Sequence, residues 1–261
     1  MNADDRTPLY QMDALNRFSD RAEAYAQYRP TYPTEAIAAL LSGLGEPSQL
    51  TAADVGAGTG IAARLLGDYG IRVWAIEPNA AMQQAATPHP RVTFRVETAE
   101  QTALAGASVD LVTCFQSFHW FDPVKSLQEF HRILKPSGRL ALVWNERDQD
   151  DAFTAQYTHL IRVASNYHPA EQRRARTVEA EVLASSPLFQ NFRQYSFIYR
   201  QPVELQGLIG RAKSTSYLPQ SGAIYKQLVA DLTQLYEEGV ETYGTIAIEH
   251  QTIVLLAESA L

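Results

Sequence analysis

Short apolar segments alternate with amphipathic ones along the middle of the chain, between residues 50 and 145. Apolar runs predict buried strands over residues 50–55, 71–76, 92–96, 109–114 and 140–144. Helical periodicity predicts helices over residues 61–69, 79–86 and 126–134. Strands that alternate with helices form a mostly parallel sheet covered on both faces, so we predict an α/β fold whose ligand binds at the carboxyl ends of the strands.

On either side of this core, proline and glycine residues mark the ends of further predicted helices and strands. An apolar stripe from Phe18 to Ala26 predicts a helix that stops before Pro30, and Thr34 is expected to cap a second helix that continues to Leu41. Beyond residue 145 the pattern predicts strands over residues 192–200 and 252–257, and helices over residues 153–166, 170–183, 203–213 and 224–239. The last of these helices is expected to end at Gly239.

Composition and charge narrow the class of protein. Hydrophobic residues make up 46% and charged residues 20% of the 261 residues, as in an ordinary globular protein, and the net charge of −7 argues against nucleic acid as a main partner. No apolar run reaches the roughly 20 residues of a membrane helix, so no membrane contact is expected. The single cysteine, Cys114, excludes an internal disulfide and favours a reducing, cytoplasmic location. Arg173, Arg174 and Arg176 are predicted to form a solvated helix face.

A glycine-rich turn joins the first predicted strand to its helix. Its sequence, from residue 54 to 60, is Asp-Val-Gly-Ala-Gly-Thr-Gly. A dinucleotide-binding turn has the pattern G-x-G-x-x-G and would place its third glycine at position 61, which is Ile61 here. The next strand ends at Glu77, 19 residues after Gly58, where an acid can accept hydrogen bonds from ribose hydroxyls. The turn predicts a cofactor that contacts the backbone closely.

These motifs together resemble class I S-adenosylmethionine (SAM)-dependent methyltransferases, in particular the methyltransferase type 11 group and its members similar to trans-aconitate methyltransferase. The resemblance covers residues 18–147 and includes the tyrosine-rich string before Pro33 and the Lys-Pro-Ser-Gly segment at 135–138. It implies a single Rossmann-like, doubly wound domain with an antiparallel edge hairpin and a helical lid. The implied parts are a domain over residues 1–261, a SAM-binding core over 46–145 completed by 190–202 and 245–258, and lid elements over 1–35, 146–189 and 203–240.

The resemblance also implies a set of cofactor-binding residues. The turn and strand ends contribute most of them, and an arginine fork suits the carboxylate of the cofactor. The full set is Arg29, Asp54, Gly56, Ala57, Gly58, Gly60, Glu77, Pro78, Met82, Thr98, Ala99, Glu100, Phe115 and Gln116. Thr98 is a departure, because many such enzymes carry an Asp there that binds the adenine amino group.

Methyl transfer is an in-line displacement that needs alignment and exclusion of water more than acid or base catalysis. A phenol or amine acceptor would need a base, for which His119 has a suitable ordinary pKa, whereas a carboxylate would not. Trp120 is predicted to line the methyl site, because an aromatic face attracts a cation. His119 and Trp120 are the candidate catalytic residues, and the alternative is an aromatic wedge that packs on the following helix.

Candidate substrate-binding residues follow from the resemblance to methyltransferases that esterify small carboxylic acids, such as trans-aconitate and juvenile hormone acid. They are Tyr25, Gln116, Trp120, Ser214, Ser216 and Tyr217, although the three near position 215 equally fit a polar loop between helices. We therefore predict a small-molecule substrate, no metal, and a monomer or homodimer. The rival functions are an NAD(P)-binding oxidoreductase and a non-catalytic SAM-binding protein of the same fold.

Overall fold

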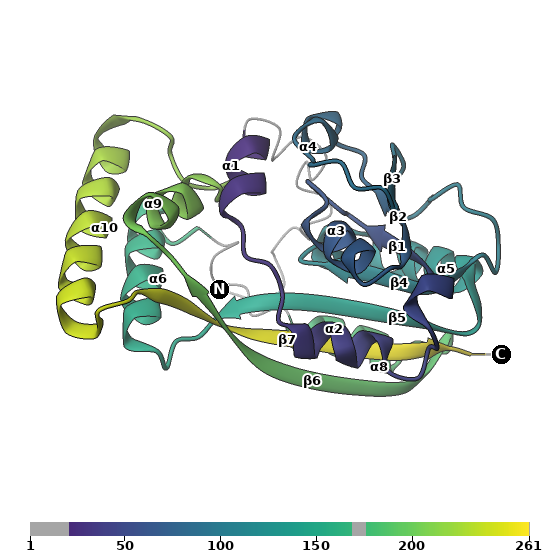
Figure 1. Cartoon of the computed structure of the whole chain (residues 1–261). Helices are drawn as coiled ribbons and strands as arrows, with labels where there is room; N and C mark the ends of the chain where they lie inside the picture. The colour runs from purple at the N-terminus through teal and green to yellow at the C-terminus, as the bar shows by residue number, and fades with distance from the viewer. Residues whose placement is uncertain (1–20, 169–175, 261) are drawn as a thin grey trace, which may run out of the picture.

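The core of the protein is a seven-stranded sheet with the strand order β3-β2-β1-β4-β5-β7-β6. The computed structural model describes residues 21–168 and 176–260 (Figure 1). Its strands are β1 (Thr51–Val55), β2 (Arg72–Ile76), β3 (Val92–Arg95), β4 (Val109–Phe115), β5 (Leu134–Arg147), β6 (Phe189–Pro202) and β7 (Ala247–Ser259). The strands β1 to β5 are parallel, and β7 lies antiparallel to both β5 and β6. The predicted mostly parallel sheet with an antiparallel edge is confirmed.

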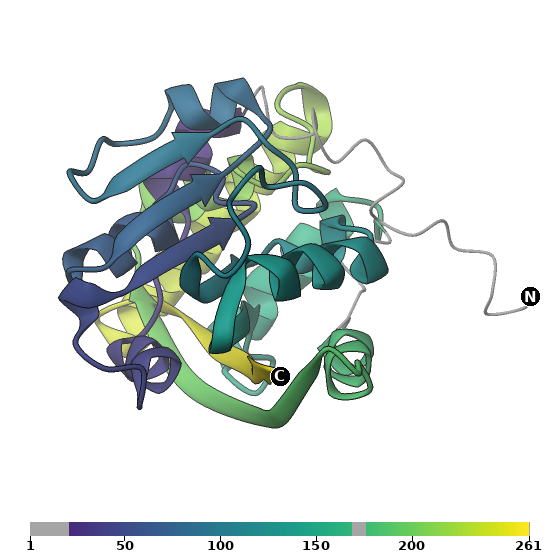
Figure 2. The same cartoon turned by 90° about the vertical axis from the view of Figure 1, so that its right-hand side faces the viewer.

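Helices cover both faces of the sheet, as Figure 2 shows. One face packs against α2 (Thr34–Leu41) and α3 (Ile61–Asp68), and the other against α5 (Pro123–Ile133) and α8 (Arg176–Ala184). Along β5 the two cores alternate: Leu142 and Trp144 belong to one and Ala141 and Val143 to the other. Alternation of this kind follows from the two-residue period of a strand, and it explains why these strands are apolar throughout.

A third hydrophobic core lies beside the sheet, in a group of helices that we call the helical cap (Figure 1). The cap consists of α6 (Ala152–Ala164), α9 (Leu205–Lys213) and α10 (Gly222–Tyr243). The short helix α1 (Ala22–Tyr28) contacts both α9 and α4 (Ala80–Gln84), so it connects the cap to the carboxyl ends of the first strands. The predicted lid segments coincide in part with the cap and α1, and closure of a lid stays a prediction. The lid residues before 21, the segment 169–175 of the predicted helix, Arg173 and Arg174 lie outside the described residues.

Several predicted boundaries are wrong: for example, β7 begins at residue 247 and not at 252, and α5 begins at residue 123 and not at 126. Three of the differences have a local cause. Helix α10 continues past Gly239 to Tyr243, because that glycine is the point where the helix packs against Ile246 and Phe153, and a Cβ there would lie 2.8 Å from Ile246 Cδ1. Strand β5 begins at Leu134, and the Lys-Pro-Ser-Gly segment expected to separate helix from strand is accommodated as an irregularity within it. Thr34 is the first residue of α2 and not its cap, because Pro33 precedes it in extended conformation.

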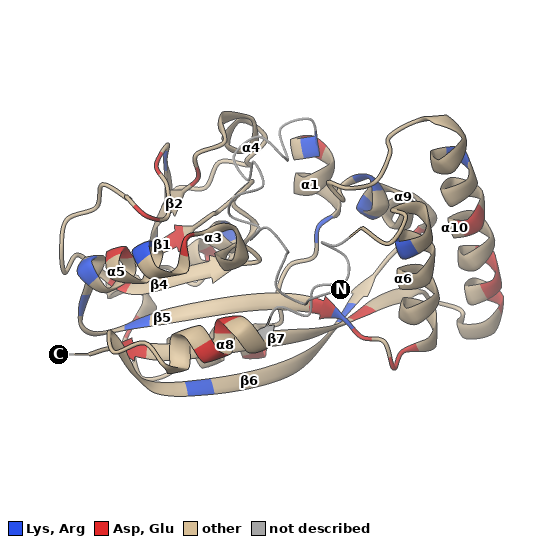
Figure 3. Cartoon of the chain, turned by 180° about the vertical axis from the view of Figure 1, so that it is seen from behind, with Lys and Arg blue, Asp and Glu red and all other residues tan. Residues whose placement is uncertain are grey.

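Along the ribbon in Figure 3, Lys and Arg positions are interspersed with Asp and Glu positions, and acidic positions recur along α10. Within the described part of the chain, no helix has the length and apolarity needed to cross a membrane.

Candidate active site

The glycine turn follows β1 and begins α3, with Gly56, Gly58 and Gly60 all at positive φ of 57° to 74°. A side chain at Gly56 would collide with the segment after β4, because its Cβ would lie 2.6 Å from Ser117 Cβ. Ser117 in turn donates a hydrogen bond from its hydroxyl to the carbonyl of Val55 at 2.7 Å. The turn is therefore held against the end of β4 by contacts that only a glycine permits.

Glu77 ties the glycine turn to the end of β2. Its carboxylate accepts hydrogen bonds from the backbone N–H groups of Gly58 at 2.8 Å and Asn79 at 2.9 Å. Burial raises the pKa of Glu77, and these two N–H donors partly offset that effect. The two bonds fix the turn before any ligand is present. A contact with a ribose stays a prediction, but the structure adds a positioning role for this acid.

Asp54 is a buried carboxyl at the end of β1, where it accepts a hydrogen bond from the Thr113 hydroxyl at 2.9 Å. Burial raises its pKa to about 7, and the neighbouring Glu77 acts in the same direction. Asp54 also lines the pocket described next, so an acid that titrates near neutrality faces the candidate site.

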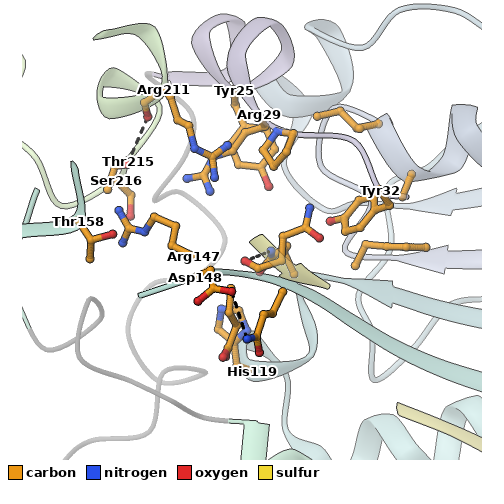
Figure 4. Close-up of a pocket in the computed structure, with 18 of the residues that line it drawn as sticks. Tyr25, Arg29, Tyr32, His119, Arg147, Asp148, Thr158, Arg211, Thr215 and Ser216 are labelled. Carbon is orange, nitrogen blue, oxygen red and sulfur yellow. Dashed lines mark hydrogen bonds between the residues drawn. The ribbon is translucent and has the colours of Figure 1, made fainter. Parts of the chain in front are cut away.

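One continuous cavity of about 550 Å³ extends from the glycine turn to the helical cap (Figure 4). We call its two sides the glycine wall (Asp54, Gly56 and Ala57) and the arginine wall (Arg29, Arg147 and Arg211). Other predicted site residues also line the cavity: Tyr25, Phe115, Gln116, His119, Trp120, Ser216 and Tyr217. The structure therefore brings together residues as far apart in the sequence as Tyr25 and Tyr217, as expected for the carboxyl ends of parallel strands and the segments that cover them.

His119 and Trp120 lie on a single 3-10 turn (Phe118–Trp120) after β4, with their rings 5.0 Å apart between centroids. The indole Nε1 of the buried Trp144 donates a hydrogen bond to His119 Nδ1 at 3.3 Å. An indole N–H can only donate, so Nδ1 must be unprotonated and the neutral ring carries its proton on Nε2. Gln116, at a φ of 57°, donates from Nε2 to the carbonyl of Asn145 at 3.0 Å and so joins the ends of β4 and β5.

The arginine wall was not predicted as a unit from the sequence. Arg211, on α9, is only 8% exposed, and burial lowers its pKa to about 10, with Arg29 and Arg147 acting in the same direction. Arg29 donates to the hydroxyl and the carbonyl of Ser214 at 3.1 and 3.3 Å and lies over the Tyr25 ring. Arg147 is the last residue of β5 and lies over the Tyr157 ring. Figure 4 shows the three side chains extending into the cavity from different segments.

Several predicted residues lie outside the lining of this cavity. They are Gly58, Gly60, Glu77, Pro78, Met82, Thr98, Ala99, Glu100 and Ser214. Met82 is buried against the glycine turn, where a Cβ on Gly58 would lie 3.1 Å from its Cε. Glu100 accepts a hydrogen bond from the backbone of Asp122 at 2.9 Å, and Ser214 is fully buried behind Arg29. Their roles toward a ligand stay predictions.

In the part of the chain that the structure describes, no group of three or more His, Cys, Asp or Glu side chains is arranged to hold a metal ion.

Comparison with known proteins gives consistent results. Residues 53–142 match the family model described as a methyltransferase domain. An uncharacterized methyltransferase of Mycobacterium tuberculosis is 38% identical over 133 residues, which are 51% of this chain and 53% of that protein. The chain thus spans about half the length of the first curated relatives it matches.

Two solved structures share the fold. A putative methyltransferase from an antibiotic biosynthesis pathway of Anabaena variabilis has a TM-score of 0.63 at 22% identity, over 92% of this chain and all of that one. A phosphoethanolamine N-methyltransferase of Haemonchus contortus, solved with S-adenosylhomocysteine, has a TM-score of 0.57 at 17% identity, over 96% of this chain and 59% of that one. The class I methyltransferase fold expected from the sequence is confirmed.

Proposed function

We propose that this chain, which carries a methyltransferase domain over residues 53–142 on a class I methyltransferase fold, moves a methyl group from SAM to a small-molecule acceptor. The observation that carries the proposal is the single cavity lined both by the glycine turn and by the helical cap. Its volume of about 550 Å³ lies in the range of small-molecule sites. A cofactor at the glycine wall and an acceptor beneath the cap would therefore share one continuous cavity.

The residues present fit this cofactor. The glycine turn has no side chain at Gly56, Gly58 or Gly60, and Glu77 already holds the N–H of Gly58 in place. When bound, SAM supplies an electrophilic methyl on a sulfonium: the acceptor–carbon bond forms as the carbon–sulfur bond breaks, and the electron pair stays on sulfur. The protein's part is to align the reacting atoms and exclude water. Tyr32, Phe115 and Trp120 give the cavity an aromatic lining suited to a cationic methyl group.

We further propose that the acceptor atom is a carboxylate oxygen. Because Trp144 donates to His119 Nδ1, the neutral ring carries its proton on Nε2, and this Nε2–H is a hydrogen-bond donor and not a base. A carboxylate is already ionised at neutral pH and can accept that hydrogen bond, whereas a phenol or amine would have to lose a proton to the ring. Positive charge at the arginine wall supports an anionic acceptor in the same way.

Calorimetry against SAM and NADH, followed by a labelled-methyl screen, tests the proposal. We expect SAM to bind and NADH not to bind, and we expect label to pass to carboxylic acids as base-labile methyl esters. Binding of NADH alone would support the oxidoreductase. Binding of SAM without turnover on carboxylic acids, phenols, thiols or amines would support a non-catalytic SAM-binding protein. Label on phenols or amines alone would retain the methyltransferase and reject the carboxylate.

A further inference from the structure

We propose that the arginine wall is a subsite for a second oxyanion group of the substrate, so that the acceptor is a small dianion anchored at Arg211 by the group that is not methylated. The inference rests on the proposed function and narrows its substrate class. One oxyanion, the carboxylate, accepts the methyl group near His119. The other, a carboxylate or a phosphate, binds Arg211 and Arg147, whereas Arg29 of the same wall is the predicted partner of the cofactor's carboxylate.

Arg211 is the anchor because its charge is buried and faces the cavity without an anionic partner. Its Nη2 lies 3.0 Å from His250 Nε2 and its Nη1 donates to Gln201 Oε1 at 3.3 Å. Both partners are neutral, since burial lowers the pKa of His250 to about 2. Among the described residues, no carboxylate is placed within ion-pair distance of Arg211. A buried charge without a counter-charge is costly, and a bound anion removes that cost.

Two further arginines lie close enough to Arg211 to affect its charge. Arg29 and Arg147 both lower the pKa of Arg211, as like charges nearby must. Glu146, Asp148 and Asp150 also line the cavity, and among the described residues none of these carboxylates is placed within ion-pair distance of Arg211. The Asp148 carboxylate accepts from the backbone N–H of Asp150 at 2.9 Å and from Gln251 at 3.3 Å. Asp54 belongs to the glycine wall. A guanidinium keeps its charge at neutral pH and offers two parallel N–H donors, which is the geometry that suits a carboxylate or phosphate.

The local fold holds these arginines in place before a ligand arrives. The ring of Tyr28 packs directly on α9 at Gly210, where a Cβ would lie 2.4 Å from the ring, and this close approach brings the end of α1 to Arg211. The Ser214 hydroxyl connects the two segments, because it accepts from Arg29 at 3.1 Å and donates to the carbonyl of Arg211 at 2.7 Å. A site fixed in this way loses little conformational entropy on binding.

Direct binding tests the subsite without any turnover. Straight-chain dicarboxylates, the matching monocarboxylates and inorganic phosphate are titrated into the full-length protein with and without saturating S-adenosylhomocysteine. We expect dicarboxylates or phosphate to bind more tightly than monocarboxylates, and Arg211→Met to weaken that binding roughly 10- to 100-fold. The matched control is Arg200→Met, which removes an exposed arginine of β6 that is paired with Glu249 of β7 and should leave anion binding unchanged. Preference for phosphate over dicarboxylates would identify the second group.

Arg211→Met must be shown to fold by near-ultraviolet circular dichroism. If it does not fold, Arg211→Lys and Arg147→Met decide: both should weaken anion binding, the first because a lysine lacks the bidentate fork. Equal anion affinity in wild type and these variants, or no anion binding at all, would overturn the subsite. If the protein methylated a monocarboxylic acid equally well, the proposed function would be retained and the subsite rejected. If anions bound at Arg211 but SAM did not bind, the subsite would be retained and the proposed function rejected.

A second comparison excludes the cofactor's own carboxylate as the occupant. 5′-Methylthioadenosine lacks the amino-acid tail of S-adenosylhomocysteine, so a residue that binds the tail affects only the larger ligand. Arg29→Met should lower the affinity for S-adenosylhomocysteine and leave the affinity for methylthioadenosine unchanged, as the predicted contact with the cofactor's carboxylate requires. Arg211→Met should leave both affinities unchanged. Selective loss of S-adenosylhomocysteine in Arg211→Met would reassign Arg211 to the cofactor and reject the subsite.

Discussion

The glycine wall and the arginine wall each bury an ionisable group, and they do so with opposite consequences. Burial raises the pKa of Asp54 to about 7, so this acid can shed most of its charge when its surroundings are dry. Burial lowers the pKa of Arg211 to about 10, so this guanidinium stays charged at any physiological pH. The charge of Asp54 in the glycine wall can be removed by protonation, whereas the charge of Arg211 in the arginine wall can be balanced only by an anion.

The two walls also use different parts of the chain. The glycine wall acts through backbone, shaped by Gly56 and fixed by the bonds from Gly58 and Asn79 to Glu77. The arginine wall acts through long side chains from α9, the end of β5 and the segment after α1. A backbone site suits a cofactor that is always the same, and a side-chain site suits a substrate that differs among relatives. This division is consistent with the proposed positions of cofactor and substrate.

The largest effect is expected from Asp54→Asn, as a gain in stability. An acid whose folded pKa lies above its unfolded value binds more protons when folded, so wild-type stability should fall as pH rises from about 4 to about 7. The rise from 3.8 to about 7 corresponds to roughly 4 kcal/mol when the acid is fully ionised. Urea unfolding measures the free energy of unfolding at pH 4 and pH 8. The stability of Asp54→Asn relative to wild type should be greater at pH 8 than at pH 4.

The control for Asp54→Asn is Asp231→Asn, which changes an exposed acid on α10 that is bonded to Gln227. It should leave the difference between pH 4 and pH 8 unchanged. If the free energy of unfolding of Asp54→Asn changed with pH as that of wild type does between pH 4 and pH 8, Asp54 would be ionised in the folded protein already at pH 4. The contrast with Arg211 would then disappear.

Gly58→Val should weaken S-adenosylhomocysteine at least about 100-fold while the protein stays folded. Position 58 has a φ of 57°, which a β-branched residue adopts only under strain, and the added side chain would stand over the turn. The nearest atom to the new Cβ is the flexible end of Met82, so the fold can adjust. Calorimetry measures the affinity, and anion binding at the arginine wall should not change.

Gly244→Val separates backbone strain from the ligand effect. Gly244 also has positive φ, at 77°, but nothing lies within 4 Å of its added Cβ at the end of α10. It should lose a similar amount of stability and keep its affinity for S-adenosylhomocysteine. Equal losses of affinity in the two variants would show that general strain, and not the turn, controls binding.

The difference between the glycine wall and the arginine wall also explains which parts of the site the sequence could predict. Strands, helices and the glycine turn are local patterns: Gly56, Gly58 and Gly60 stand within five positions, and the strand that follows ends at Glu77 a fixed distance later. Their convergence follows from the rule that parallel strands end at one edge. Residues such as Gln116 and His119 were found because they directly follow β4.

The arginine wall had no local signal. Arg29, Arg147 and Arg211 are far apart in sequence and meet only because α1 and α9 pack through Tyr28 and Gly210. A single arginine on a helix most often faces solvent, so only tertiary structure could reveal that Arg211 is buried. One clue in the sequence is the helical periodicity of α9. It places Arg211 on the same face as the apolar residues Leu208 and Ala212, although Arg211 is a basic residue of the last turn.

Glu77→Ala should weaken S-adenosylhomocysteine roughly 10- to 100-fold. The substitution leaves the N–H groups of Gly58 and Asn79 without their acceptor and also removes the predicted ribose contact. Asp110→Ala is the matched control: it deletes a carboxylate that accepts from the backbone of Thr51 at 2.9 Å, at the opposite end of β1. Affinity measured by calorimetry should be unchanged there. Unchanged affinity in a folded Glu77→Ala protein would remove Glu77 from the site.

His119→Asn should have the smallest effect and the most specific one. If Nε2–H only donates to an ionised acceptor, its loss should raise KM roughly tenfold and leave kcat within a few-fold of wild type, because no proton moves in the reaction. The kcat profile of the wild type should then show no rise between about pH 5.5 and 7.5. His119→Gln can restore a donor near Nε2 and should recover part of KM. A base would instead contribute 10²- to 10⁴-fold to kcat, and neither variant would recover it. A collapse of kcat in both variants would therefore reject the carboxylate acceptor, and unchanged kcat and KM in both would leave His119 as part of an aromatic wedge.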